Sequence, residues 1–444
     1  MKAFLLLLLV LVVVGAPAAL YLLSAHPTLE LTPVPRAIGA EFLLVVRTNA
    51  PFGLRHLSAT VRQGPAVSSA SYSEPANRFL FWKKRLGPAT HALNLTISPA
   101  RGFRSGPAKL SLDAVSNDLR AAATSLSLDV VLNLEPPRLT VDPGQHYITQ
   151  GGAGLVTFTV AGFSTESGVK IGPYTFRSFP MPGAKSAGER FCLFVFPWDV
   201  PATARPVVYA ANPAGQQVTA TFHASVKPGR FRKRDLELTG EFLDKAIAAL
   251  DLAGTGDPLD RFLRINGELR RQNNSTLAAL RDQTEQRFLW TPPFQQLSNS
   301  KVEAFFADVR SYKYQGKKVD QQVHLGFDLS KVQQAPVVAS AAGKVLHASA
   351  LGIYGNCIVI DHGYGLQSIY GHLSSIAVKP GQAVQRGEEI GRSGATGLAG
   401  GDHLHFSIQI DGVQANPLEW WDPHWINDRI LSQLPASAIS GGQR

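Results

Sequence analysis

The stretch GGDHLHFSIQI, from Gly400 to Ile410, decides the fold of the C-terminal region and raises its main chemical question. We expect this stretch to form a short β-strand. Successive side chains of a strand point to opposite faces, so His403 and His405 would emerge side by side, with Leu404 turned the other way. Two imidazoles on one strand face are either a polar, solvated surface or part of a metal site. The rest of the chain has to distinguish between these two readings.

Short β-runs and dense glycine surround this stretch from Thr291 to Asp428. Runs such as APVVASAAGKVLHAS, GNCIVIDHG and LQSIYGHL are bounded by turn residues, as is typical of strands joined by tight turns. We therefore predict a β-domain at residues 291–428, followed by a frayed tail at residues 429–444.

The histidines of the chain concentrate in this predicted domain. HLGFD contains His324 and Asp328, and YGHL contains His372. The glycine at 326 argues against a helix, and in an extended segment the even separation of His324 and Asp328 lets both side chains aim at one point. Two imidazoles and one carboxylate, with a fourth position left to water, are the donor set of a catalytic zinc site.

The spacing within HLH separates two roles. One short strand cannot easily place both His403 and His405 on one tetrahedral metal, together with the distant His-Asp pair, without crowding out the water. One of the two histidines is therefore better used beside the metal. A zinc-bound water needs a proton acceptor, and the oxyanion that forms on an attacked carbonyl needs a donor. His403 and His372 suit those two jobs.

Three ordered motifs, HLGFD, YGH and HLH, resemble the H-x-x-x-D, Y-x-H and H-x-H motifs of the lysostaphin and LytM type of zinc metallopeptidase. That family cuts the peptide bridges of bacterial peptidoglycan. The resemblance covers residues 291–428 and implies an antiparallel β-sheet peptidase domain. It also implies site residues: one Zn²⁺ per chain on His324, Asp328 and His405, catalytic histidines at His372 and His403, and a substrate-orienting Tyr370.

The resemblance implies a zinc endopeptidase that hydrolyses peptide bonds in the stem or cross-bridge peptides of peptidoglycan. The alternative is a non-catalytic peptidoglycan-binding regulator that activates a partner cell-wall amidase, and hydrolysis of another extracellular protein is a weaker one. Peptidoglycan is the expected partner, and proteins of cell-wall synthesis or division are possible others. Many relatives have a proline at the position of Asp402 and an acidic residue at that of Ser407, which leaves substrate preference open. The bond cut could join D-alanine to a diamino acid or lie within a glycine bridge.

Composition restricts the partners and the metal chemistry. The formal net charge is +10, which favours acidic partners, but the basic residues are scattered. The cluster KPGRFRKR at residues 227–234 has no nucleic-acid-binding motif beside it, so we expect a solvated linker and no nucleic-acid partner. Cys192 and Cys357 are the only cysteines, which excludes a Cys-rich zinc site.

The N-terminus begins MKAFLLLLLVLVVVGAPAALYLLSAHP. One lysine precedes about 20 apolar residues that end near Leu23, a length sufficient to cross a bilayer. We predict a signal anchor or signal peptide at residues 1–25, with retention in the cytoplasmic membrane favoured over cleavage at the APA of residues 16–18. The expected location is the cell envelope, anchored in the inner membrane with the body in the periplasm or outside. Secretion after cleavage is the alternative.

Between this segment and the predicted peptidase domain, the pattern is mainly β. About seven short alternating runs at residues 27–135, among them FLFWKKR at residues 79–85, predict a β-sandwich of immunoglobulin type. A second set of runs predicts another β-sandwich module at residues 136–227. The chain is thus expected to be a mainly β, multidomain protein, and both modules to be spacers or binding modules.

A helical connector is predicted at residues 235–290. Phe242, Leu243, Ile247 and Leu250 fall on one helical stripe, with Thr239 as its cap. Asp257 followed by proline is expected to open a second helix, and a third is expected in STLAALRDQTEQRFLW, at residues 275–290. The stripe is interpreted as core packing and the helices as a connector, with a peptide-binding or partner-binding surface as the alternative.

Overall fold

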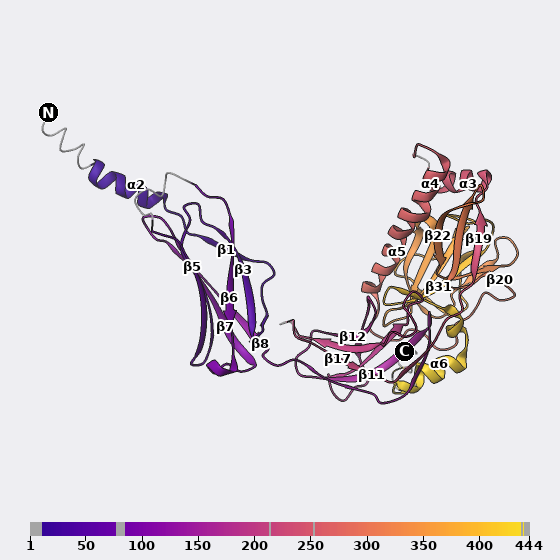
Figure 1. Cartoon of the computed structure of the whole chain (residues 1–444), viewed down its shortest axis with the longest axis horizontal. Coiled ribbons are helices and arrows are strands. Elements are labelled where there is room, and N and C mark those ends of the chain that lie inside the picture. The colour runs from indigo at the N-terminus through magenta and orange to yellow at the C-terminus, as the bar shows by residue number, and fades with distance from the viewer. Residues whose placement is uncertain (1–10, 77–84, 213–214, 252–253, 437, 439–444) are drawn as a thin grey trace. The chain divides into compact units, whose positions relative to one another are not determined.

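The computed structural model of the chain (Figure 1) describes residues 11–76, 85–212, 215–251, 254–436 and 438. The chain folds into two compact units. The first is Met1–Arg138 with the short segments Gly162–Thr165 and Ala211–Val218, and the second is the remainder of the chain. Each unit is mainly β, in agreement with the predicted fold class.

Two short helical elements begin the described part of the first unit. A π-helical turn, η1, spans Leu11–Gly15, and α2 spans Ala16–Leu23. Among the described residues, no helix is both long and apolar enough to cross a bilayer. The predicted anchor at residues 1–25 lies partly in residues 1–10, outside the described residues, and stays a prediction.

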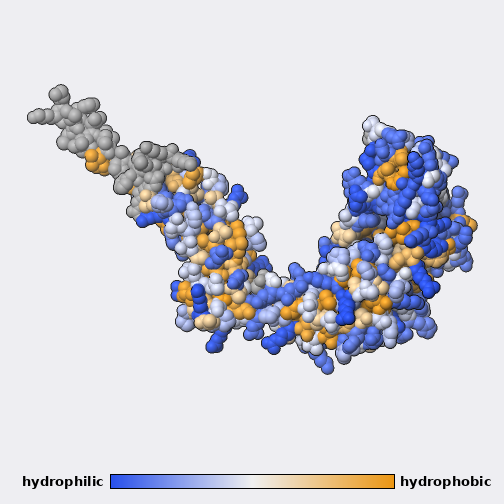
Figure 2. Space-filling model, viewed as in Figure 1, coloured by the Kyte–Doolittle hydropathy of each residue, from blue (hydrophilic) through white to orange (hydrophobic). Residues whose placement is uncertain are grey.

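The first unit continues as two sheets packed face to face. Their facing side chains form one apolar core, in which Val46 and Leu95 of one sheet meet Leu57 and Leu110 of the other, each at most 1% exposed. Figure 2 shows apolar patches on the surface of this unit as well. The predicted strand at residues 79–85 lies, apart from its last residue, outside the described residues. One sheet has the order β1 (Thr28–Leu31), β3 (Glu41–Asn49), β6 (Ala89–Thr96), and the other β2 (Ala37–Ile38), β8 (Ala123–Leu132), β7 (Gly106–Ser116), β4 (Leu54–Gln63), β5 (Ala66–Ser73).

The second β-module also contains two sheets. Phe176 and Phe194, one from each sheet, are both fully buried with ring centroids 6.5 Å apart, so the sheets share one aromatic core. The sheets have the orders β14 (Phe179–Pro180), β15 (Glu189–Val195), β11 (Ala153–Ala161), β9 (Arg138–Val141) and β13 (Tyr174–Arg177), β12 (Glu166–Ile171), β16 (Val207–Ala211), β17 (Gln217–Thr221), and a parallel pair joins β10 (His146–Thr149) to β18 (Ala224–Lys227).

The helices follow the predicted start signals but not all of the predicted ends. Thr239 Oγ1 accepts from Phe242 N at 3.2 Å and caps the first helix, and Asp257 caps the second. The predicted third helix at residues 275–290 is wrong as a separate element, because residues 275–283 continue the second helix and no helix follows to residue 290. Gly267 lies inside this run, as in the predicted second helix, since one interior glycine costs only about 1 kcal/mol. The elements are α3 (Gly240–Leu250), then α4 (Pro258–Arg264), η4 (Ile265–Leu269), α5 (Arg270–Ala279) and η5 (Leu280–Gln283) in one run.

An eight-stranded sheet forms the centre of the C-terminal domain. Its strand β31 (Leu404–Ile410) lies between β23 (Phe327–Ser330) and β27 (Leu366–Leu373), antiparallel to both. The remaining strands of this sheet are β20 (Lys301–Ala304), β26 (Asn356–Asp361), β25 (Gly343–Ala350), β29 (Ala383–Val384) and β32 (Val413–Ala415), and a small sheet is built from β24 (Pro336–Val338), β30 (Glu389–Arg392) and β28 (Ser375–Ile376).

A further three-stranded sheet crosses the domain boundary expected at residue 291. Strand β19 (Lys233–Glu237) pairs in parallel with β21 (Asp308–Tyr314), which pairs with β22 (Lys317–His324). The prediction that residues 227–234 are only a solvated linker is therefore wrong at its end. Leu236 and Leu238 pack with the buried Tyr312 in one apolar cluster. The charged residues next to these leucines made the segment look solvated in the sequence.

The C-terminal segment is also more ordered than expected. After η7 (Pro417–Trp421), α6 spans Pro423–Arg429 and η8 spans Leu431–Gln433. Ile430 is fully buried and Leu434 is 7% exposed. The predicted tail at residues 429–444 is thus wrong at its beginning, because these apolar residues belong to the folded domain.

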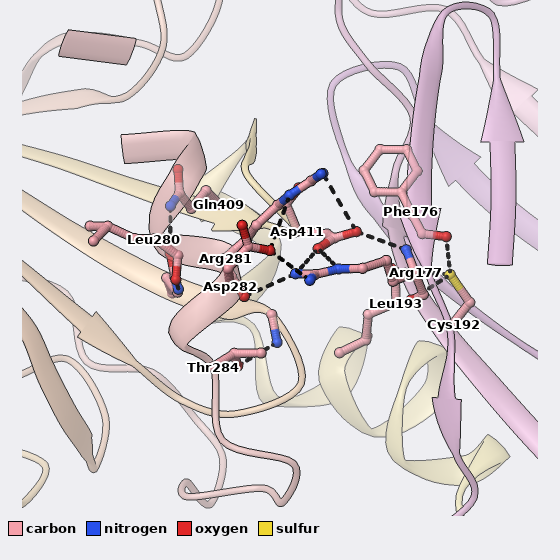
Figure 3. Close-up of polar contacts among 12 residues, drawn as sticks. Phe176, Arg177, Cys192, Leu193, Leu280, Arg281, Asp282, Thr284, Gln409 and Asp411 are labelled. Atoms are coloured by element: carbon pink, nitrogen blue, oxygen red, sulfur yellow. Dashed lines mark hydrogen bonds and ion pairs between the residues drawn. The ribbon is translucent and has the colours of Figure 1, made fainter. Parts of the chain in front are cut away.

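The second β-module is joined to the C-terminal domain by a polar cluster around Arg177 (Figure 3). Arg177 Nε donates to Asp411 Oδ1 at 2.7 Å, its backbone N–H donates to Asp411 Oδ2 at 2.7 Å, and Nη1 donates to Asp282 Oδ1 at 2.8 Å. Aromatic rings add to this contact, since Phe191 and Tyr364 lie edge to face with centroids 4.9 Å apart. Asp411 directly follows β31, so the module is fastened at the end of the strand that contains His405.

Candidate metal centre and active-site cleft

Strand register brings the predicted ligands together. Across β23 and β31, Asp328 lies opposite His405, and across β27 and β31 the partner of His405 is Gly371. His324 ends β22, and His403 immediately precedes β31, where it bridges to Gly394. Two pairs of motif residues, His324 with Asp328 and His403 with His405, lie about 80 residues apart in the sequence and meet where β23 pairs with β31 beside the end of β22.

The side chains of His324, Asp328 and His405 form a compact group whose ligand atoms all lie within 4.8 Å of one another. Asp328 Oδ1 lies 2.9 Å from His324 Nε2 and 3.1 Å from His405 Nδ1, and those two nitrogens are 3.0 Å apart. All three residues are at most 9% exposed. Two imidazole nitrogens and one carboxylate oxygen therefore converge on one point.

This group fits a zinc ion. His324 Nδ1 lies 3.0 Å from the Phe305 carbonyl oxygen and must donate to it, so Nε2 keeps its lone pair for a metal. Tetrahedral coordination with bonds of about 2.0 Å places ligand atoms roughly 3.3 Å apart, close to the separations found here. His405 Nε2 is buried without a hydrogen-bond partner among the described residues, so the polar contacts of this ring go through Nδ1.

Electrostatics favour an ionised Asp328 carboxylate beside a neutral His405 ring. Burial opposes ionisation of Asp328, but the attraction of His324 and the hydrogen bonds from His324, His403 and His405 outweigh it and hold the pKa of Asp328 well below its ordinary value. Burial lowers the pKa of His405 to about 4. A metal ligand has to be deprotonated. The lowered pKa of Asp328 and the lowered pKa of His405 both favour the deprotonated form.

Arg310, on β21, holds the second oxygen of the same carboxylate. Its Nη2 donates to Asp328 Oδ2 at 2.9 Å, while Oδ1 faces the imidazoles. One oxygen of the carboxylate thus faces the metal position and the other binds Arg310, which fixes the orientation of the carboxylate. Sequence reasoning missed Arg310 because it belongs to none of the three motifs and lies 14 residues before the first of them.

Replacing Arg310 with glutamine is expected to weaken zinc binding about 10- to 100-fold, as is typical when an outer-shell partner of a ligand is lost. The change leaves Asp328 in place but removes the charge that orients it. Competition with a fluorescent chelator measures the zinc affinity directly. Arg392→Gln is the matched control, because Arg392 is 47% exposed and pairs with Glu389 on the surface. Equal affinities in the wild type and both variants would contradict this role for Arg310.

His372 and His403 lie beside the metal position with ring centroids 4.8 Å apart. His372 Nδ1 donates to the Thr396 carbonyl at 2.9 Å, and His403 Nδ1 donates to the Gly401 carbonyl at 2.8 Å. Each ring therefore uses Nδ1 for a backbone carbonyl, and Nε2 of His403 lies 3.4 Å from Asp328 Oδ1. Both predicted catalytic histidines are brought to the metal group.

The two rings differ in their preference for a proton. Burial and then the neighbouring His403 and His405 lower the pKa of His372 well below its ordinary value. Burial also acts to lower the pKa of His403, but its hydrogen bond and attraction to Asp328 outweigh burial, and that pKa is raised. The arrangement therefore favours a neutral His372 and a protonated His403.

Tyr370 contradicts its predicted role in orienting substrate. Its ring is 1% exposed and packs on Phe406, and its hydroxyl accepts hydrogen bonds from Ser340 N at 2.8 Å and Ser368 Oγ at 3.0 Å. The reason is the backbone of His372, whose φ of +61° interrupts the strand alternation that would otherwise put both side chains on one face. Tyr370 is a core residue.

A cleft of about 360 Å³ opens over the metal group. One wall contains the five motif residues and Tyr354, and a second wall comes from residues that precede the predicted peptidase domain. The connector interpreted from sequence as structural therefore also forms part of the candidate site. No motif marks this second wall, which consists of Arg234, Leu236, Glu237, Leu238, Phe242, Arg270 and Asn274.

The C-terminal domain is a peptidase M23 domain, since the Peptidase family M23 matches residues 322–417. An uncharacterized metalloprotease of Haemophilus influenzae is 44% identical over 96 residues, 21% of this chain and 20% of the relative. The peptidoglycan DD-endopeptidase ShyA of Vibrio cholerae is 31% identical over 185 residues, 41% of this chain and 40% of the relative. The murein hydrolase activator NlpD of Salmonella dublin is 36% identical over 96 residues, 21% of this chain and 25% of the relative. The chain thus spans between a fifth and two fifths of the length of these relatives.

Proposed function

We propose that this chain, with its C-terminal M23 domain, is a zinc metalloendopeptidase that hydrolyses peptide bonds in the stem or cross-bridge peptides of peptidoglycan. The observation that carries the proposal is the convergence of His324, Asp328 and His405 on one point, with His372 and His403 directly beside it. Two imidazoles, one carboxylate and an open side toward a cleft are the features of a catalytic zinc site rather than a closed structural one.

The chemistry divides between the ion and the two remaining histidines. Zinc held by the trio would polarise the scissile carbonyl and lower the pKa of water. His372, whose Nδ1 donates to Thr396, can accept the water proton at Nε2. His403, whose pKa is raised, can donate from Nε2 to the oxyanion that forms on the carbonyl. The leaving amine then takes up the proton held by His372.

The proposed location is the cell envelope, with residues 1–25 as an anchor in the inner membrane and the body outside the cytoplasm. The support is the continuous apolar segment that ends near Leu23. Peptidoglycan is the proposed partner in that compartment, and the two β-modules are proposed as spacers or binding modules. N-terminal sequencing of the mature protein tests whether the segment is retained.

A non-catalytic role as an activator of a wall amidase is the second candidate. The similarity to the murein hydrolase activator of Salmonella dublin favours it. The presence of all three ligand positions and both flanking histidines supports hydrolysis instead, because an activator that does not cut bonds has no need of them.

Digestion of purified peptidoglycan by the full chain, loaded with zinc, tests the proposal. We expect new peptide ends in the muropeptides, identified by mass spectrometry, and no change in the glycan. A chelator should abolish the cleavage and added zinc should restore it, because the proposed reaction needs the ion. A protein that binds one zinc per chain yet leaves every wall peptide intact would refute the enzyme and leave the activator.

A further inference from the structure

Arg270, in the wall of the cleft that precedes the M23 domain, is a cation without an anionic partner among the described residues. It lines the cleft and is partly buried, yet no carboxylate among the described residues lies within ion-pair distance of it. Its Nε and Nη2 donate to the backbone and side-chain oxygens of Asn266, at 3.1 and 2.6 Å. Nη1 has no hydrogen-bond partner in the described part of the chain, so one edge of the guanidinium remains available.

The guanidinium is held in place before any ligand arrives. Asn266, which is fully buried, donates from Nδ2 to Asp320 Oδ2 at 2.7 Å, and this fixes the amide that in turn holds Arg270. Asp320 therefore orients Asn266 rather than neutralising Arg270 directly. Preorganised donors lose little conformational freedom on binding, which is the usual property of a recognition site rather than of a solvated surface arginine.

Helix α5 attaches this arginine firmly to the metal side of the cleft. Asn273 Oδ1 accepts from Ile353 N at 2.8 Å, and Asn274 Oδ1 accepts from the Tyr354 hydroxyl at 2.9 Å. The Tyr354 ring lies 5.6 Å from that of His405, centroid to centroid. Arg270 and Asn274 are four residues apart on one helix face, so both are presented to the same cleft.

The other charged groups of the cleft are exposed or already engaged. Arg234 is exposed and donates from Nη1 to the Glu303 carbonyl oxygen at 3.0 Å. Arg310 holds Asp328. Glu303 pairs with Lys301 at 3.0 Å and accepts from Ser330, and Glu237 accepts from Gly316 N. Arg270 is therefore the partly buried cation of the described cleft that still lacks an anion. A carboxylate is the anion whose geometry matches an edge of the guanidinium.

We infer that Arg270 binds a free carboxylate of the substrate, on a residue that flanks the scissile bond. This inference rests on the proposed peptidoglycan endopeptidase activity and narrows its substrate class. Stem peptides cross-linked through a dicarboxylic diamino acid keep a carboxylate beside the linking amide, whereas the internal bonds of a glycine bridge have none. The cleft thus selects carboxylate-bearing cross-links over uncharged bridges.

The test compares two synthetic cross-linked peptides that differ only in the carboxyl group beside the scissile amide, which is either free or a carboxamide. With the full zinc-loaded chain, we expect kcat/KM to be about 10- to 100-fold higher for the free carboxylate, as one charge-assisted interaction provides. In Arg270→Gln this preference should fall to near one through loss on the carboxylate peptide alone. Arg270→Lys, which keeps the charge but not the fork, should retain an intermediate preference.

Arg271→Gln is the matched control, because it makes the same charge change at an exposed position of the same helix that does not line the cleft. It should keep the wild-type preference. Calorimetric binding of the same two peptides gives the ratio even if neither is cut, so failure of the proposed reaction is distinguishable from failure of this inference. A binding preference that is absent in the wild type, or unchanged in Arg270→Gln and Arg270→Lys, would overturn the role of Arg270.

Discussion

Replacing His405 with alanine is expected to remove zinc binding and hydrolysis together. The substitution leaves His324 and Asp328 as the only members of the trio and removes the nitrogen 3.0 Å from His324 Nε2. Loss of a direct ligand should exceed the 10- to 100-fold effect of an outer-shell change, so we expect zinc affinity to fall by more than about 100-fold. Elemental analysis after dialysis measures the metal, and release of muropeptides measures the activity.

His372→Asn is the informative comparison with His405→Ala. Asparagine tolerates the left-handed backbone at this position, where φ is +61°, better than alanine does. We expect this variant to keep its zinc and to lose about 10²- to 10⁴-fold in rate, the range for a lost proton-transfer group. Loss of zinc in both variants to the same degree would contradict the division between metal ligands and catalytic histidines. Retained hydrolysis in His405→Ala would contradict the metal site itself.

The site residues could be predicted from sequence because each motif is local. Within HLH, two-residue alternation relates the two histidines, while HLGFD keeps His324 and Asp328 four residues apart across the bend between β22 and β23. The structure then only has to bring these two strands and β31 together. Alternation also predicted that Tyr370 and His372 share one face of their strand. This prediction was wrong, because the sequence YGH does not indicate the positive φ of His372. A single residue outside the extended region reverses which side chains share a face.

The other wall of the cleft could not be predicted, for a different reason. Arg270, in this wall, and Arg310, which binds Asp328, are ordinary residues of a helix and a strand, and only tertiary packing brings them into the cleft. Strand β19 was missed in the same way, since its pairing with β21 joins segments more than 70 residues apart and buries leucines between charged neighbours. Local periodicity carries no information about such long-range pairing.

Replacing Arg177 with methionine is expected to lower the free energy of unfolding of the second unit by about 3 kcal/mol. The Asp411 side chain is 1% exposed, and the variant leaves this buried carboxylate with Arg281, 4.0 Å away, as the one remaining cation that the described ion pairs place beside it. Removing one partner of a buried pair is costly because the other charge stays out of water. Urea unfolding followed by tryptophan fluorescence measures the change. Arg392→Met, which breaks an exposed pair with Glu389, should change stability by only about 0–1 kcal/mol.

The double variant Arg177→Met with Asp411→Asn separates two explanations of that loss. If an unpaired buried charge is the cause, neutralising Asp411 should restore most of the stability, because the amide oxygen still accepts the Arg177 backbone N–H that Asp411 Oδ2 accepts at 2.7 Å. If the lost packing of the long Arg177 side chain is the cause, the double variant should be no more stable than the single one. Asp411 directly follows β31, the strand that contains His405. Recovery of stability without recovery of hydrolysis would therefore also mean that the polar cluster around Arg177 positions this strand.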